Sequence, residues 1–161
     1  MTRRPGRVYP RPRAVCAVHR GARHHDVLVN LPAPPRILVV DDDAGVRSML
    51  CRYLRRQGCT VETATDGAEG LEWVLRAGFD AIVSDIEMPS MNGAEFWRRV
   101  VVLHPHLRDR FLFCSSLPLP TSMPPDHAIR FVAKPFELAD LWVKLTDLLV
   151  SPSPSGSAEA D

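Results

Sequence analysis

Five short segments of the sequence have the character of strands, because each is rich in apolar residues and stops at polar or turn-forming ones. The first, at 37–40, is Ile-Leu-Val-Val and is followed by three aspartates. A segment at 59–64 alternates apolar and polar residues, and further apolar runs lie at 79–85, 111–114 and 129–133. Short runs of this kind are typical of strands in a buried sheet. The pattern therefore predicts five strands.

Helices are expected between these strands, where hydrophobic residues recur at spacings of three and four positions. One follows the aspartates and ends near Gly58, and the next begins at Asp66 and ends near Gly78, since aspartate and glycine commonly cap helix ends. The residues expected on buried helix faces are Val46, Met49, Leu50, Tyr53 and Leu54, then Ala68, Leu71, Val74 and Leu75, then Phe96, Val100 and Leu103, and finally Leu138, Leu141, Trp142, Leu145, Leu148 and Leu149.

Strands that alternate with amphipathic helices are typical of an α/β fold in which helices cover both faces of a parallel sheet. We therefore expect a doubly wound sheet of five parallel strands. The connection between the fourth and fifth strands differs from the others, because residues 116–128 contain four prolines and no helical apolar stripe. Proline inside a helix costs roughly 3 kcal/mol or more, so this fourth helix is expected to be short or missing.

The composition predicts one ordered domain, at 36–150, between two tails. The chain has 161 residues, of which 45% are hydrophobic. Residues 1–35 contain seven arginines, six prolines and a single acid, a composition that favours disorder. Residues 151–161 are rich in serine and proline, and they are expected to form a second disordered tail.

Charge and hydropathy argue against two classes of partner. Twenty basic and nineteen acidic residues give a net charge of +1, so the overall field attracts neither nucleic acid nor an anionic membrane. The arginines of 1–35 lack interleaved aromatic residues and a recognition helix, and a misassigned start codon would explain them equally well, so nucleic acid is not expected as a partner. The sequence has no run of about eighteen apolar residues and no apolar stretch typical of a secretory signal. We expect a cytoplasmic protein without a membrane partner.

Polar residues interrupt the apolar runs where the strands end, at Asp41, Asp42, Asp85, Ser115 and Lys134. Ligands of open parallel sheets bind beyond the carboxyl ends of the strands, so one site is expected there. A single aspartate after a strand commonly caps the next helix. Three converging carboxylates are different, because they repel one another unless a cation or a proton neutralises them. Mg²⁺ suits such a set of oxygen ligands.

The same residues suggest phosphoryl transfer. A carboxylate can attack phosphorus and form an aspartyl phosphate. The reaction then depends on positioning and on positive charge more than on further covalent chemistry. Lys134 is placed to supply the charge and Ser115 a hydroxyl donor.

Four segments resemble the motifs of the response regulator receiver domains of bacterial two-component signalling. They are ILVVDDD at 37–43, FDAIVSDIEMPSMNG at 79–93, FCSS at 113–116 and FVAKPF at 131–136. The resemblance covers residues 36–150 and implies a flavodoxin-like sheet with strand order 2-1-3-4-5.

The resemblance implies a role for each matching residue. Asp85 corresponds to the phosphoacceptor. Asp41 and Asp42 correspond to the acid pair that holds Mg²⁺ together with Asp85, and Glu87 to the position whose backbone carbonyl completes the metal shell.

Four further positions match the family on the last two strands. Ser115 corresponds to the hydroxyl that binds the phosphoryl group, and Lys134 to the lysine that pairs with one of its oxygens. Pro135 matches a proline that often follows a cis bond. Phe131 matches the aromatic residue that switches its rotamer with the state of Ser115.

The function implied is that of a single-domain response regulator, a switch rather than an enzyme. Its phosphodonor is expected to be a sensor histidine kinase or a histidine phosphotransfer protein, and its output a contact with an unknown downstream protein. In the family the fourth helix is part of the output surface. The spacing from Ser115 to Lys134 is shorter than usual, so that surface is expected to differ here.

Two alternatives stay open at this point. A pseudo-receiver would keep the fold and bind proteins without being phosphorylated, although all the expected site residues are present. A haloacid-dehalogenase-like phosphatase is suggested by the Asp41-x-Asp43 pair. Such enzymes need a further acidic pair after the strand that carries the lysine, whereas Asp140 and Asp147 lie within the last predicted helix.

Overall fold

The computed structural model describes residues 33–118, 120, 123 and 130–151. Five parallel strands form one sheet in the order β2-β1-β3-β4-β5, which confirms the predicted fold and strand order. The strands are β1 (Arg36–Val40), β2 (Thr60–Ala64), β3 (Ala81–Asp85), β4 (Phe111–Ser115) and β5 (Arg130–Ala133).

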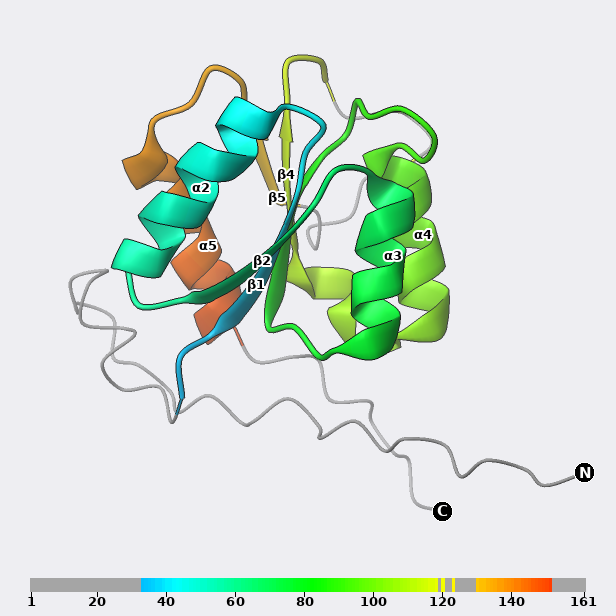
Figure 1. The fold of residues 1–161 in the computed structure, drawn as a ribbon, viewed down its shortest axis with the longest axis horizontal. Helices are drawn as coiled ribbons and strands as arrows, with labels where there is room; N and C mark the ends of the chain where they lie inside the picture. The colour runs from blue at the N-terminus through cyan, green and yellow to red at the C-terminus, as the bar shows by residue number, and fades with distance from the viewer. Residues whose placement is uncertain (1–32, 119, 121–122, 124–129, 152–161) are drawn as a thin grey trace, which may run out of the picture.

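Helices cover both faces of the sheet, and they do so in pairs. Helices α2 (Ala44–Arg56) and α5 (Leu138–Val150) lie on one side, and α3 (Gly67–Arg76) and α4 (Gly93–Leu103) on the other (Figure 1). Each side has its own hydrophobic core, one centred on Phe96 and Phe111 and the other on Leu50, Leu141 and Leu145. The sheet is therefore buried on both faces, as its apolar strands require.

Three helices begin at a polar residue that follows a strand or loop and caps the first turn. The side chains of Asp43, Asp66 and Asn92 each accept a hydrogen bond of 2.9 Å from the backbone N–H three positions further on. These caps satisfy backbone donors that a helix leaves unpaired at its N-terminus. They hold the starts of α2, α3 and α4 at the carboxyl edge of the sheet.

The contact between α3 and α4 is made by small residues that the hydrophobic pattern did not single out. Gly67 and Gly70 are buried on α3, and a Cβ atom at either position would lie 3.0 Å from the Phe96 side chain of α4. By contrast, Leu75 is 48% exposed and Ala68 is also exposed. The predicted apolar stripe of α3 is therefore wrong at those two positions, because glycine allows a closer approach than leucine.

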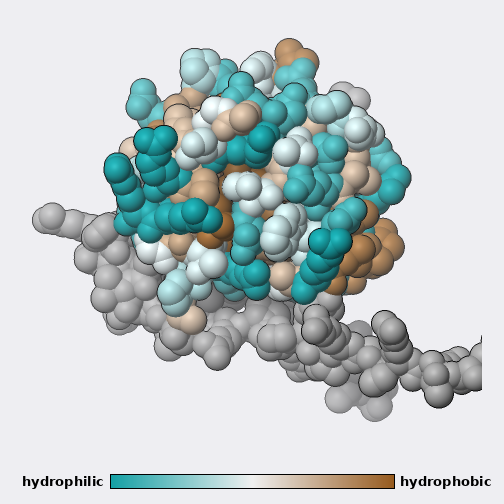
Figure 2. Space-filling model, viewed as in Figure 1, coloured by the Kyte–Doolittle hydropathy of each residue, from teal (hydrophilic) through white to brown (hydrophobic). Residues whose placement is uncertain are grey.

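Two other expected core residues also lie at the surface, Met49 of α2 and Leu103 of α4. Figure 2 shows a mainly hydrophilic face, with hydrophobic side chains gathered at its right-hand edge, on the side of α4. Among the helices of the described segments, none combines the length and apolar character that a membrane span needs.

A short 3-10 helix, η1 (Pro105–Arg110), lies between α4 and β4 and was not predicted. Leu107 is the one buried hydrophobic residue of η1, and a single residue gives no periodic pattern from which a helix could be predicted.

The segment 116–128, where a short or missing helix was predicted, lies mostly outside the described residues. The residues of this segment that are described, 116–118, 120 and 123, are not helical. The predicted tails likewise lie outside them, except for residues 33–35 and 151.

Candidate functional site

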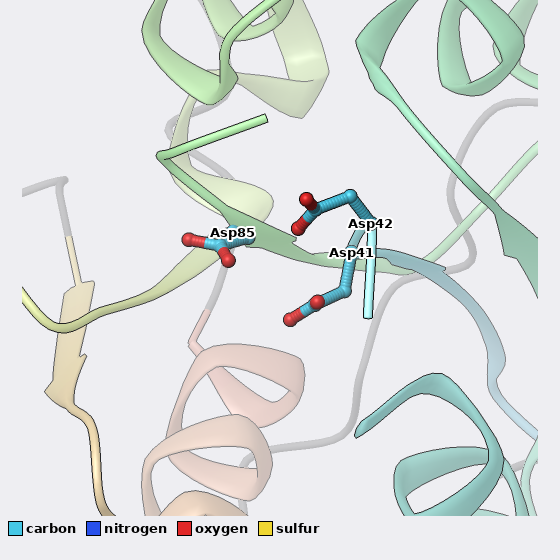
Figure 3. A group of neighbouring side chains, drawn as sticks. All are labelled: Asp41, Asp42 and Asp85. Carbon is cyan, nitrogen blue, oxygen red and sulfur yellow. The ribbon is translucent and has the colours of Figure 1, made fainter. Parts of the chain in front are cut away.

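Three carboxylates meet where the two central strands end. Asp41 and Asp42 directly follow β1, and Asp85 is the last residue of β3, which pairs with β1. One carboxylate oxygen from each of the three lies within 4.8 Å of the others. Figure 3 shows the side chains of Asp41 and Asp42 leaving β1 toward the same region as that of Asp85. Asp41 and Asp85 are buried, and Asp42 is exposed.

Lys134 reaches this cluster from the end of β5, at the edge of the sheet. Its Nζ donates a hydrogen bond of 2.6 Å to Asp85 Oδ2 and one of 2.9 Å to Asp41 Oδ2. The lysine side chain is 19% exposed, so water screens these two ion pairs only partly. A single ammonium group therefore bridges two of the three carboxylates.

The pKa shifts at the site reflect this crowding. Burial raises the pKa of the Asp41 carboxyl above its ordinary value, against the opposing effect of the hydrogen bond from Lys134. Burial by itself lowers the pKa of the Lys134 ammonium, but the hydrogen bonds to Asp85 and Asp41 outweigh it and raise that pKa overall. Lys134 is therefore charged at neutral pH, while the protein opposes a full negative charge on Asp41.

Asp43, next in the chain, belongs to the helix rather than to the cluster. Its carboxylate caps α2 by accepting from Val46 N, and its own backbone N–H donates to Asp41 Oδ1 at 2.9 Å. The Asp43 carboxylate is therefore engaged in capping α2 and is not free to act as the second acid of the Asp41-x-Asp43 phosphatase pattern. Asp140 and Asp147, the other candidate acids of that pattern, are exposed on α5.

Glu87 and Ser115 approach each other beside Asp85. The Glu87 backbone N–H donates to Asp85 Oδ1 at 3.1 Å. The Ser115 hydroxyl donates to Glu87 Oε2 at 3.5 Å, a long hydrogen bond, and accepts one of 3.0 Å from Leu117 N. The hydroxyl is therefore held by Glu87 and by the loop after β4.

Gly93 permits the tight path of the loop that follows Asp85. A Cβ atom at Gly93 would lie 2.1 Å from the Asp85 carbonyl oxygen, and the Gly93 N–H donates to Ile86 O at 2.9 Å. The Asp85 carbonyl oxygen also accepts a 2.8 Å hydrogen bond from the Ser84 hydroxyl. No larger residue fits at position 93 without moving the backbone of the candidate phosphoacceptor.

The remaining predicted residues flank the site. The Lys134–Pro135 peptide bond is cis. Phe131 lies on β5, partly buried against the core that contains Phe96 and Phe111. Arg47 was not anticipated: its guanidinium donates to the Asp41 carbonyl at 2.6 Å. Nothing in the sequence distinguishes Arg47 from the other arginines of α2, because its role depends on how the helix is docked.

The donor set fits a hard divalent cation. Three carboxylates bring three potential negative charges, and Lys134 contributes the one positive charge bonded to them within the described residues. One ammonium offsets one of these three charges, and burial raises the pKa of the Asp41 carboxyl, so the site favours a bound cation. Oxygen ligands with excess negative charge are those that Mg²⁺ prefers.

Comparison with known proteins agrees with this geometry. Residues 37–146 match the family model of the response regulator receiver domain. The chain belongs to this family. Receiver domains act in two-component systems, so residues 37–146 form a receiver domain of two-component signalling.

Relatives with curated functions contain the receiver domain within longer chains. The chain is 46% identical over 95 residues to protein-glutamate methylesterase/protein-glutamine glutaminase 1 of Anaeromyxobacter dehalogenans, covering 59% of this chain and 26% of that protein. It is 36% identical over 126 residues to response regulator MprA of Mycobacterium leprae, covering 78% of this chain and 55% of MprA. The chain thus spans about a quarter to about half the length of these relatives.

Solved receiver structures share the fold. The chemotaxis protein CheY4 of Vibrio cholerae is 31% identical and superposes with a TM-score of 0.65, covering 72% of this chain and 99% of CheY4. The response regulator TrrA of Thermotoga maritima, solved in complex with Mg²⁺ and BeF, is 28% identical, with a TM-score of 0.63 and coverage of 71% and 98%.

Proposed function

We propose that this receiver domain accepts a phosphoryl group on Asp85. The observation that carries the proposal is the paired contact of Lys134 Nζ, 2.6 Å from Asp85 Oδ2 and 2.9 Å from Asp41 Oδ2, beside a third carboxylate. It gathers a nucleophile, a fixed positive charge and oxygen ligands for a cation at one edge of the sheet. The phosphodonor is a histidine kinase or a histidine phosphotransfer protein. The reaction takes place in the cytoplasm, where ATP supplies the phosphoryl group to the kinase.

Asp85 acts as the nucleophile in this scheme. A carboxylate oxygen forms a bond to phosphorus as the bond from phosphorus to the donor histidine nitrogen breaks, and the released imidazole takes up a proton. The Glu87 N–H keeps the other carboxylate oxygen of Asp85 oriented. The product is an aspartyl phosphate, which water later hydrolyses.

Lys134 and Ser115 stabilise the transferred group. Lys134 already faces the reacting carboxylate, so its ammonium pairs with a phosphoryl oxygen after a short movement. Ser115 exchanges its long bond to Glu87 for one to another phosphoryl oxygen. The exchange draws the loop after β4 toward the site, and Phe131 on the neighbouring strand is placed to respond to it.

Asp41, Asp42 and Asp85, with the Glu87 carbonyl, would hold Mg²⁺. When bound, the ion supplies positive charge that offsets the charge of the phosphoryl oxygens and of the three carboxylates.

The proposal is tested by intact mass after incubation with acetyl phosphate and Mg²⁺. The expected result is one added phosphoryl group, absent from Asp85→Asn and from an EDTA control. Asp147→Asn, a matched change on the exposed face of α5, should be labelled as the parent is. No gain of mass under any condition would contradict phosphoacceptance and favour a protein-binding module that is never phosphorylated.

A further inference from the structure

Helix α2 carries a concentration of positive charge that acids on the same helix do not offset. Its 13 residues include four arginines and no acid, whereas α3, α4 and α5 each contain at least one aspartate or glutamate. Figure 2 shows strongly hydrophilic side chains gathered on the left of the view, the side on which Figure 1 places α2. Like charges three or four positions apart on a helix repel each other, so this surface favours a bound anion.

A groove on α2 is lined by three of these arginines. It has a volume of about 460 Å³, and its lining residues are Ser48, Cys51, Arg52, Arg55 and Arg56. The three arginines are three and four positions apart, so their side chains lie on one face of the helix. All three are exposed, and the exposed Ser48 adds a hydroxyl donor one turn earlier. No acid lines the groove.

The three guanidinium groups keep most of their donors available. Arg55 donates one hydrogen bond of 2.9 Å to a main-chain carbonyl of β2, which anchors its side chain beside that strand. Arg52 and Arg56 form no ion pair with any other residue that the structure describes. Glu62, the acid of β2, pairs instead with Arg36 at 3.5 Å. Since each guanidinium has five N–H donors, the groove offers both charge and donors to a ligand.

The size and chemistry of the groove favour a small molecule with several phosphate groups. The planar fork of arginine matches two oxygens of one phosphate. A single phosphate group carries roughly two negative charges at neutral pH, fewer than the three positive charges present. The volume of about 460 Å³ is typical of small-molecule sites. An acidic protein partner would instead require an apolar centre of contact, and no large hydrophobic residue lines the groove.

We propose that the α2 groove binds an anion with a chain of phosphate groups, either inorganic polyphosphate or the triphosphate of a nucleotide. Arg55, held beside β2, binds one phosphate, and Arg52 and Arg56 bind its neighbours in the chain. This site is separate from the carboxylate cluster, because Asp41 and Asp42 precede the N-terminus of α2 and the groove begins at its second turn. The inference does not depend on phosphorylation of Asp85.

The test is a titration of the full chain with inorganic tripolyphosphate in metal-free buffer at an ionic strength of about 0.15 M. Calorimetry should show saturable binding of one molecule. The amide NMR signals of Arg52, Arg55 and Arg56 should shift, and that of Asp85 should not. Inorganic monophosphate should bind about tenfold more weakly or less, because it meets fewer guanidinium groups. ATP distinguishes the two sources: tighter binding than tripolyphosphate indicates a nucleotide, and equal binding indicates the phosphate chain alone.

Matched variants separate a specific site from general charge attraction. Arg52→Gln combined with Arg56→Gln should weaken tripolyphosphate binding about tenfold or more. Arg76→Gln combined with Arg99→Gln removes the same charge from α3 and α4 and should change binding by less than about twofold. Arg52→Lys combined with Arg56→Lys keeps the charge but loses the forks, so a loss of about threefold is expected.

Three outcomes would overturn the proposal. They are the absence of saturable binding to the parent protein, equal weakening by the α3 and α4 pair of changes, and binding of a hexaglutamate peptide as tight as that of tripolyphosphate. The last result would indicate an acidic protein as the ligand of α2.

Discussion

Asp41 is a buried carboxylate whose surroundings oppose its own negative charge. Its pKa is raised by burial, so the folded state binds the Asp41 proton more tightly than the unfolded state does. The stability this contributes is fully present below the ordinary aspartate pKa, near pH 4, and is lost as the pH rises through the higher pKa of the folded state. At neutral pH the ionised group costs stability.

We therefore predict that Asp41→Asn stabilises the protein at pH 7 in metal-free buffer by roughly 1 kcal/mol. The gain should disappear below about pH 4, where Asp41 is protonated in both states. Urea unfolding at the two pH values, with EDTA present, measures the difference. The exposed Asp147→Asn serves as the control and should show no such gain; a loss of stability for Asp41→Asn at pH 7 would contradict the account.

Gly93 offers a second test at the scale of one residue. A methyl group there collides with the Asp85 carbonyl, whereas at Gly78 no atom lies within 4 Å of the added Cβ position. Gly93→Ala should lower the free energy of unfolding by about 3 kcal/mol or more, and Gly78→Ala by less than about 1 kcal/mol. Thermal or urea unfolding of the pair provides the comparison. Similar effects at both positions would mean that the loop after β3 adapts easily.

Helix α5 is tied to the rest of the fold at its C-terminal end by an arginine from η1. Arg110 is buried, and its guanidinium donates to the carbonyls of Leu148 at 2.6 Å and of Ser151 at 3.0 Å. These carbonyls have no partner within the helix, so the positive charge both caps them and complements the helix dipole. The element that follows β5 and Lys134 is thereby fixed at the end remote from the site.

Removing this cap should loosen the C-terminal end of α5. We predict that Arg110→Met lowers the free energy of unfolding by about 2–4 kcal/mol, through the loss of buried charge-assisted hydrogen bonds. Arg99→Met, which breaks only an exposed pair with Glu95, should cost less than about 1 kcal/mol. Hydrogen exchange would localise the effect to the last turn of α5. An Arg110 variant as stable as the Arg99 variant would contradict this view of the helix end.

The elements also show what a hydrophobic pattern can and cannot predict. The stripe of α5 was predicted correctly at Leu141, Trp142, Leu145, Leu148 and Leu149, because one face of that helix packs on the sheet. The pattern failed at Leu75 and Ala68 of α3, where glycines form the buried face. Hydrophobicity marks a residue that gains from burial, but it does not mark one that is buried because it is small.

At the scale of the whole molecule, topology assembles the site. Asp42 and Lys134 are far apart in the sequence, yet strand order and parallel direction bring the ends of β1, β3 and β5 to one edge. The sequence therefore predicted which residues meet, because polar residues after apolar runs mark the ends of the strands. It did not predict that Lys134 bridges two carboxylates, that Glu87 holds Ser115, or that Arg47 supports Asp41. Those contacts depend on side-chain conformations that leave no periodic trace.

A cation that binds only the folded site should stabilise the whole molecule. At a Mg²⁺ concentration tenfold above its dissociation constant, the expected gain is about 1.4 kcal/mol. Asp42→Asn should reduce this gain, because it removes one exposed ligand of the cluster, and Asp147→Asn should retain it. Unfolding curves with and without Mg²⁺ measure the effect. An equal Mg²⁺ effect in the Asp42 variant would place the ion elsewhere.

The account centres on Asp85 as the residue that carries the phosphoryl group. The most direct measurement is reduction of the phosphorylated protein with borohydride, which converts an aspartyl phosphate to homoserine, followed by peptide mass spectrometry. The predicted result is homoserine at position 85 alone, and none at positions 41, 42 and 43, which also lie at this edge. Homoserine at one of those positions, or phosphorylated protein without homoserine at 85, would contradict the central claim.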